Sequence, residues 1–298
     1  MIRASCIYMP NCILAEGCMW DGHEGKLYFI DIEAGEIYSL DTAPVRGQPG
    51  GADKPSPVRI YRQGDLTGCM VFHRDGGLVA AVKNRLVYQN LSDGAQRVLM
   101  RQNFPDTIRY NDGKCDRYGN LWVGTMAVSQ EWSGARGCGS LYCIRENRVV
   151  AEYPGYTIPN GMDWNEDGSM FYHVDTALQR IDASEVENQI HLKNRHPVLC
   201  VPEEDGSPDG MCMDENGNFW VAMWGGSRVI CYEAATGKKL EEVEVPDKYV
   251  SCCCFGGESG RSLFITTARG EDGTGGQIYR AEAGVRGAGR YRYGENIR

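Results

Sequence analysis

The stretch "IPNGMDWNEDG" occupies residues 158–168, and 49 residues later the chain continues with "SPDGMCMDENG" at 207–217. The two segments align without gaps, and each ends at a turn glycine followed by an aromatic run, "SMFYHVDT" or "NFWVAMW". A third copy, "YNDGKCDRYGNLWVGTM", places Gly119 another 49 residues before Gly168. A fixed period of this length indicates repeated structural units, and these units decide the fold.

Three fainter copies follow the same plan, and each has its own turn glycine. In every copy, short β-rich runs are separated by Asp-Gly, Asn-Gly or Gly-Gly pairs, which is typical of successive hairpins. Clear second hairpins begin with "GEIYSLD" (35–41) and "GSLYCIREN" (139–147). The six turn glycines are Gly25, Gly77, Gly119, Gly168, Gly217 and Gly260.

Six units of about four strands each predict an all-β fold, a six-bladed β-propeller with four-stranded antiparallel blades. A β-sandwich or a barrel is the alternative, but neither needs a regular period. Long amphipathic helices are missing, and 38 glycines fit many tight turns. No linker divides the chain, so we expect a single domain over 1–298, with "RGQPGGADKPSP" (46–57) as an insertion between strands.

Charge and hydropathy exclude several kinds of partner. A net charge of -9 argues against nucleic acid, because phosphate binding needs a basic surface. No apolar run approaches the length of about 18 residues that spans a membrane. The N-terminal segment lacks the basic and apolar regions of a signal peptide. We therefore expect a cytoplasmic protein without nucleic-acid or membrane partners, either a monomer or a weak homo-oligomer.

The 13 cysteines are scattered, odd in number and without paired CxxC motifs. The run "SCCCF" places Cys252, Cys253 and Cys254 side by side between apolar residues. These features predict reduced, buried thiols, as in a cytosolic protein. A zinc or disulfide role is the alternative.

The innermost strands of a propeller line its central channel, so equivalent residues of different blades converge there. Counting eight residues back from the turn glycines of the three clear copies gives two asparagines and an aspartate. In the copy with Gly25, one extra turn residue brings a glutamate into the same register. The two remaining copies, with Gly77 and Gly260, give cysteines. These positions are Glu16, Cys69, Asn111, Asn160, Asp209 and Cys252.

Four oxygen-bearing side chains at one channel mouth predict a cation site. Two carboxylates brought together in a poorly solvated pocket raise each other's pKa, and a divalent cation removes that cost. Oxygen donors of this kind suit Ca²⁺, Mg²⁺ or Mn²⁺, and Zn²⁺ also accepts carboxylates. The alternative is that Asn160-Gly161 and Asp209-Gly210 merely form turns. Each pair, however, already has a separate turn glycine eight residues after its polar residue.

Several long motifs resemble the regucalcin (senescence marker protein) and gluconolactonase family. They are "LAEGCMWDGHEGKLYFIDIEAGEIYSLD" (14–41), "RYNDGKCDRYGNLWVGTM" (109–126), "IPNGMDWNEDGSMFYHVDT" (158–176), "SPDGMCMDENGNFWVAMWGGSRVICYEAATGKKLEEVEVP" (207–246) and "VSCCCFGGESGRSLFITTAR" (250–269). The resemblance extends from about residue 13 to residue 281. It implies a six-bladed propeller with one catalytic divalent metal ion (Ca²⁺, Zn²⁺, Mn²⁺ or Mg²⁺) that hydrolyses small-molecule sugar lactones. The metal ligands that it implies are Glu16, Asn160 and Asp209.

The resemblance also implies substrate contacts. Arg109 and Asn111 would hold the substrate beside the metal, and Asp209 would also act as the catalytic general base. Animal members of the family favour an acidic residue where this chain has Ser129, so the resemblance does not fix the sugar preference. Glu131 and Trp132, in the same segment, are the candidates to fill part of that role.

Two further expectations concern residues outside this ring. The five histidines share no register and indicate ordinary core or surface roles, although His173 could line the channel. Four tryptophans at strand starts, Trp20, Trp122, Trp164 and Trp220, predict packing between blades. A phosphotriesterase-like hydrolase and a non-enzymatic calcium-binding propeller are the alternative functions.

Overall fold

The computed structural model describes residues 1–42 and 58–295, so the predicted insertion at 46–57 lies outside the described residues. Its elements are β-strands and two one-turn 3-10 helices, η1 (Thr176–Leu178) and η2 (Glu203–Asp205). The prediction of an all-β chain is therefore confirmed. Within these residues, no helix has the length and apolar character that crossing a membrane would require.

Four separate sheets have four strands each, arranged in antiparallel order along the chain. The first contains β3 (Ala15–Asp21), β4 (Lys26–Asp31), β5 (Glu36–Asp41) and β6 (Arg59–Arg62). The second contains β7 (Thr67–Phe72), β8 (Leu78–Val82), β9 (Arg85–Gln89) and β10 (Gln96–Arg101). The third contains β11 (Ile108–Cys115), β12 (Leu121–Ala127), β13 (Gly139–Arg145) and β14 (Arg148–Tyr156). The fourth contains β15 (Pro159–Trp164), β16 (Met170–Asp175), β17 (Arg180–Glu187) and β18 (His191–Cys200).

The remaining strands form a nine-stranded sheet that divides into two groups. One group contains β19 (Ser207–Met213), β20 (Phe219–Trp224), β21 (Arg228–Tyr232) and β22 (Lys239–Glu244). The other contains β23 (Tyr249–Gly256), β24 (Ser262–Ala268), β25 (Ile278–Glu282) and the N-terminal β2 (Ser5–Tyr8). The single residue pair Trp224–Tyr249 joins the groups, and β1 (Ile2–Arg3) adds to β22 in parallel.

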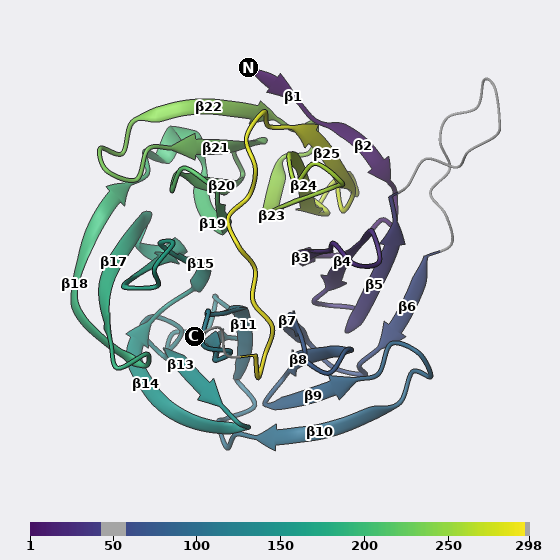
Figure 1. Ribbon diagram of the computed structural model, residues 1–298, viewed down its shortest axis with the longest axis vertical. Coiled ribbons are helices and arrows are strands. Elements are labelled where there is room, and N and C mark those ends of the chain that lie inside the picture. Colours follow the sequence, from purple (N-terminus) through teal and green to yellow (C-terminus); the bar gives the residue numbers. More distant parts are fainter. Residues whose placement is uncertain (43–57, 296–298) are drawn as a thin grey trace.

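Figure 1 shows the four-stranded groups around a central axis, with β3, β7, β11, β15, β19 and β23 innermost. Because β2 comes from the start of the chain and β25 from near its end, their pairing closes the ring. The predicted propeller architecture, with sheets of four antiparallel strands, agrees with this arrangement.

The sequence repeat is explained by a buried carboxylate at the first turn. Asp116 Oδ1 accepts the backbone N–H groups of Tyr118 and Asn120, and its Oδ2 accepts Trp122 Nε1 at 2.8 Å. Asp214 repeats this pattern and accepts Trp220 Nε1 at 3.0 Å. One aspartate therefore fixes the turn and anchors the tryptophan of the second strand, which is why "D-x-x-G-N-x-W" recurs.

The tryptophans pack between groups, as predicted, but they do not occupy one equivalent position. Trp164 is the last residue of β15 and Trp20 the second-last of β3, whereas Trp122 and Trp220 lie on second strands. Trp164 lies 6.3 Å from Trp122 between ring centroids, and Trp20 stacks on Phe264 at 5.2 Å. These large rings fill the contacts between neighbouring groups.

The chain beyond β25 runs across one end of the ring, as the yellow trace in Figure 1 shows. We call residues 286–294 the C-terminal crossing segment. It bonds to the turn end of several inner strands: Ala288 N–H donates to Met213 O at 2.9 Å, and Arg290 Nη1 donates to Trp20 O at 3.0 Å. At its far end, Tyr293 N–H donates to Phe72 O at 2.7 Å.

Candidate active site

Every innermost strand contains an irregularity near its start, where its pairing with the second strand shifts by one residue. A β-bulge of this kind bends the strand and re-aims a side chain. The shifts lie between Glu16 and Met19, Thr67 and Cys69, Tyr110 and Gly113, Pro159 and Met162, Pro208 and Met211, and Val250 and Cys252. The predicted ring residues therefore stand at bulges.

The strand pairing corrects two of the six predicted ring positions. Near its end, each inner strand has a last residue that pairs with a Leu or Phe of the second strand. The residue four places before that one is structurally equivalent in all six strands. Gly68 and Ser251 take this position, and Cys69 and Cys252 lie one residue beyond it. The prediction failed there because Gly77 and Gly260 stand one residue farther along their turns. The corrected ring is Glu16, Gly68, Asn111, Asn160, Asp209 and Ser251.

The Asn-Gly and Asp-Gly pairs do not form turns. Gly161 and Gly210 have no positive φ, and both lie inside strands. A Cβ on Gly161 would lie 2.4 Å from Met211 N, and one on Gly210 would lie 2.8 Å from Cys252 Cα. The glycines are needed because neighbouring inner strands nearly touch here, and this approach brings the ring side chains together.

The Asn160 amide is held by a hydroxyl that sequence reasoning missed. Asn160 Nδ2 donates to Thr176 Oγ1 at 3.1 Å, and Thr176 Oγ1 donates to Pro208 O at 2.8 Å. Thr176 is the first residue of η1, directly after β16. This bond fixes which end of the amide is the nitrogen, and among the described residues no hydrogen bond engages Asn160 Oδ1. No periodicity marks Thr176, because it lies outside the repeated inner strand.

Arg109 and Asn111 are bonded to each other, as neighbours on the same inner strand. Arg109 Nη1 donates to Asn111 Oδ1 at 2.8 Å and to Tyr110 O at 2.9 Å. Asn111 Nδ2 donates to Pro159 O at 2.9 Å, which joins β11 to β15. Both side chains are only 6% exposed, so a positive charge lies buried beside the ring.

The two ring carboxylates, Glu16 and Asp209, are each 6% exposed and influence each other electrostatically. Burial and the charge of Asp112 raise the pKa of Glu16 to about 8. Burial, Glu16 and Asp112 raise the pKa of Asp209 well above its usual value, while the Arg109 guanidinium opposes this shift. Asp112, which follows Asn111, is a third carboxyl at the site that the sequence analysis did not single out.

The donor set fits a hard divalent cation. Glu16 Oε2 accepts the Gly17 N–H at 2.7 Å, so its other oxygen is available beside those of Asp209 and Asn160. A cation would stabilise the charged form of two buried carboxylates that otherwise retain protons. Among the described residues, no three His, Cys, Asp or Glu side chains form a metal cluster. The expected set differs from such a cluster because one of its three donors is an amide.

Ser129 and Trp132 lie apart from the ring, in the segment between β12 and β13. This segment leaves β12 near Met126, which pairs with Arg109, so it emerges at the same end of the sheet. Trp132 is 42% exposed, and Ser129 Oγ accepts the Glu131 N–H at 3.3 Å. Both residues therefore lie outside the ring, and their contact with a substrate stays a prediction.

His173 does not line the channel, contrary to one expectation. It lies on β16, the second strand, and its ring packs against Tyr156 at 4.9 Å and Phe171 at 5.6 Å between centroids. Both of its nitrogens are buried without a hydrogen-bond partner in the described residues. Its role is in the core.

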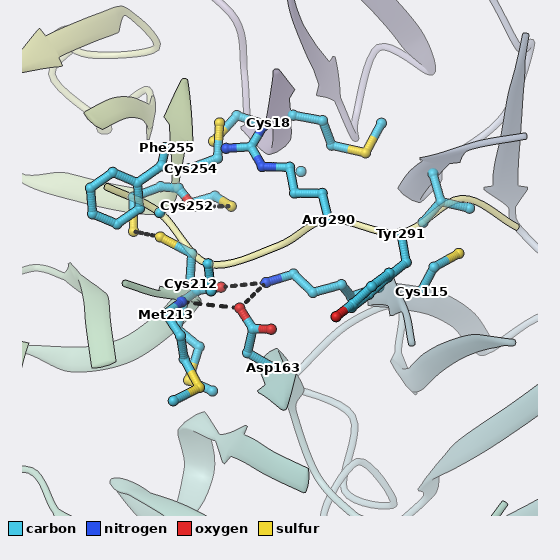
Figure 2. Close-up of a pocket in the computed structure, with 18 of the residues that line it drawn as sticks. Cys18, Cys115, Asp163, Cys212, Met213, Cys252, Cys254, Phe255, Arg290 and Tyr291 are labelled. Carbon is cyan, nitrogen blue, oxygen red and sulfur yellow. Dashed lines mark hydrogen bonds and ion pairs between the residues drawn. The ribbon is translucent and has the colours of Figure 1, made fainter. Parts of the chain in front are cut away.

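Beneath the ring, a cavity of about 90 Å³ extends to the C-terminal crossing segment. Figure 2 shows Cys18, Cys252, Cys254 and Cys212 on one side of it, Cys115 and Tyr291 on the other, and Asp163 below. Lys114 Nζ lies 2.8 Å from Asp163 Oδ2, which also accepts the Met213 N–H at 3.0 Å. All 13 cysteines are free thiols, and those along the inner strands are buried, as predicted.

The fold and the site define a β-propeller with buried carboxylates, amides and an arginine gathered at one end of its axis. A family model described as "SMP-30/Gluconolactonase/LRE-like region" matches residues 14–269, and the chain belongs to this family. The resemblance read from the sequence is confirmed.

Individual relatives cover most of the chain. Regucalcin of Bos taurus is 32% identical over 289 residues, which is 95% of this chain and 92% of the relative. The putative sugar lactone lactonase YvrE of Bacillus subtilis is 31% identical over 260 residues, covering 87% of this chain and 84% of the relative.

Solved structures agree on the fold. A luciferin-regenerating enzyme superposes with a TM-score of 0.85 at 23% identity, covering 99% of this chain and 100% of the other. A calcium-binding protein, regucalcin, from Agrobacterium tumefaciens superposes with a TM-score of 0.83 at 22% identity, covering 99% and 98%.

Proposed function

We propose that this protein hydrolyses sugar lactones at the ring of inner-strand bulges, with one divalent metal ion as cofactor. Membership of the gluconolactonase family supports sugar lactone hydrolysis in general. The observation that carries the finer proposal is the convergence of Glu16, Asp209, Asn160 and the buried Arg109 at one site.

Glu16, Asn160 and Asp209 would hold the metal ion. When bound, such an ion polarises a carbonyl and lowers the pKa of water, which is the chemistry that lactone opening needs. Three protein donors fall short of the six to eight oxygens around Ca²⁺, so the set leaves room for substrate and water. The choice among Ca²⁺, Zn²⁺, Mn²⁺ and Mg²⁺ is a matter for experiment.

The chain's own residues would bind the lactone and move its protons. The Asp209 carboxylate would accept a proton from the attacking water and return it to the ring oxygen as the ester bond breaks. Arg109 engages only Nη1 in the hydrogen bonds of the described residues, so its other N–H groups can donate to the substrate oxygens. Asn111 Nδ2 carries a second hydrogen beyond the one given to Pro159 O, and this hydrogen can donate to the developing oxyanion.

Ser129 and Trp132 would form the outer wall for the sugar. Trp132 offers an exposed ring at the mouth, and Ser129 is too short to reach far into it. We also propose that the six four-stranded groups are the six blades of one domain over 1–298, acting as a monomer or weak homo-oligomer in the cytoplasm. The N-terminal strand β2 completing the last group supports a single closed ring.

The test is a pH-indicator assay of chelator-stripped protein on gluconolactone, galactonolactone, xylonolactone and arabinonolactone. Each of the four metal ions is added back singly. We expect metal to restore turnover in the wild type and not in Asp209→Asn, and Arg109→Met to lose about 100- to 1000-fold, as when one oxyanion donor is removed. Asp93→Asn, in an exposed turn, is the matched control and should keep full activity.

Turnover by Asp209→Asn at saturating metal would rule out the general base. Metal binding without turnover on any lactone would favour the phosphotriesterase-like or calcium-binding alternatives instead. An absence of metal binding would show that the bulge ring is not a cation site.

A further inference from the structure

Two cysteine thiols meet at the contact between inner strands β19 and β23. Cys212 Sγ and Cys253 Sγ are 3.8 Å apart, and Cys253 Sγ also donates to Trp220 O at 3.3 Å. The two backbones nearly touch close by, since a Cβ on Gly210 would lie 2.8 Å from Cys252 Cα. A disulfide needs sulfurs about 2.0 Å apart and strands in close contact, so a small approach of the thiols suffices.

Successive side chains of a strand point to opposite faces, and this separates Cys253 from its neighbours Cys252 and Cys254 on β23. Cys212 and Cys253 belong to one core cluster, together with Trp220. Cys252 and Cys254 point to the opposite side of β23 and belong to the cluster that contains Cys18. Cys253 therefore faces Cys212, whereas its two neighbours in sequence face β3.

The pair borders a space that a small oxidant can occupy. Both cysteines line the cavity of about 90 Å³ beneath the ring (Figure 2). One water needs only about 10–15 Å³ of such space, so a molecule of two oxygens fits. Cys212 is 8% exposed and Cys253 is 2% exposed. Cys212 is the more exposed of the two thiols and therefore meets the oxidant first, while the bond to Cys212 and burial raise the pKa of Cys253.

We propose that Cys212 and Cys253 form an oxidation-sensitive pair that a hydroperoxide converts into a disulfide joining β19 to β23. With hydrogen peroxide, the Cys212 sulfur attacks one oxygen, the O–O bond breaks, a sulfenic acid forms and one water leaves. The Cys253 sulfur then attacks the sulfenic sulfur, the S–S bond forms, and the oxygen leaves as a second water. Two thiols lose two electrons, one peroxide gains them, and a dithiol reductant reverses the change.

This inference is independent of the lactonase proposal, and its test needs no substrate. Reduced full-length protein is treated with hydrogen peroxide, alkylated, digested with trypsin and analysed by mass spectrometry. We expect peptide 196–228 linked to peptide 249–261, two hydrogens lighter than their sum and absent after dithiothreitol. Because the first peptide also contains Cys200 and the second contains three cysteines, single variants assign the link.

Cys212→Ser, Cys253→Ser and Cys253→Ala should abolish the link, whereas Cys200→Ser, Cys252→Ser and Cys254→Ser should keep it. Oxidation should also raise the unfolding temperature of the wild type and not that of Cys253→Ala, provided that the reduced variant melts cooperatively. A link that persists in both Cys253 variants would overturn the proposal. So would a link from 249–261 to peptide 4–26, which contains Cys18, or overoxidation of Cys212 without any link.

Discussion

At the scale of single residues, the ring explains why one repeat carries asparagine where the next carries aspartate. Glu16 and Asp209 already place two buried carboxyls in the ring beside Asp112; Asp112 raises the pKa of both, and Glu16 raises that of Asp209. A further carboxylate at Asn160 would add to this repulsion. An amide supplies the same kind of oxygen without a charge, and its nitrogen can be tied to Thr176.

We expect Thr176→Val to weaken metal binding by about 10- to 100-fold, the usual cost of losing a residue that orients a metal ligand. The valine keeps the shape of the side chain but removes the acceptor for Asn160 Nδ2 and the donor to Pro208 O. Titration calorimetry of stripped protein measures the change. Thr176→Ser is the matched control and should bind like the wild type, and equal loss in both variants would contradict the positioning role.

His173 should make the fold sensitive to acid. Burial and the charge of Arg195 lower its pKa to about 3, against about 6.5 in an unfolded chain. Between these values the unfolded state binds the proton and the folded state does not. Stability is therefore full above about pH 6.5 and is lost as the pH falls towards 3, by about 2 kcal/mol at pH 5 from this residue alone.

The corresponding variant is His173→Leu, with the exposed His191→Leu as control. We expect the difference in unfolding free energy between pH 7 and pH 5 to shrink by about 2 kcal/mol in His173→Leu and to stay unchanged in His191→Leu. Urea denaturation at the two pH values measures it. An unchanged difference in both variants would show that folding does not lower the pKa of His173.

At the scale of elements, the inner strand with its bulge is the unit that the sequence repeats. The spacing from the turn glycine located Asn111, Asn160 and Asp209, because their copies share one turn length. It missed Gly68 and Ser251, where the glycine stands one residue farther along the turn. Thr176 and Ser129 lie outside the repeat, so only the folded chain shows where they stand.

The same unit predicts the effect of a methyl group at Gly161. A Cβ there would lie 2.4 Å from Met211 N and 2.6 Å from Asp209 O, so β15 and β19 must separate. We expect Gly161→Ala to cost about 1–3 kcal/mol of unfolding free energy, as overpacking does. In Gly22→Ala, the nearest atom is Trp20 Nε1 at 3.9 Å, and stability should hardly change. Equal stability of the two variants would contradict the close approach of the strands.

At the scale of the whole molecule, both ends of the chain stabilise the ring. The N-terminal β2 completes the sheet of β23, while the C-terminal crossing segment covers the turn ends of inner strands on opposite sides of the axis (Figure 1). Gly287 shows how closely this segment packs, since a Cβ there would lie 2.3 Å from Phe255 Cβ. The segment is therefore the floor of the cavity that Figure 2 shows.

Removing residues 284–298 should open that floor. We expect Cys18, Cys252 and Cys254, each at most 6% exposed, to become reactive towards a thiol reagent. Cys6 and Cys200, which are exposed in the intact chain, should react quickly in both proteins and serve as the internal control. Labelling rates at each cysteine, read by mass spectrometry, measure the change. Unaltered rates in a truncated protein that is still folded would show that the segment does not seal the cavity.

The crossing segment also determines from which end of the axis a small molecule can reach the bulge ring. The bulge ring lies at the start of the inner strands, and the crossing segment covers their turn ends. The segment therefore leaves the ring accessible along the axis from one end only. A molecule that reaches the bulge ring from the end opposite the crossing segment would have to leave by that same end. Under the lactonase function proposed above, the product would therefore have to leave the ring before the next substrate could enter it.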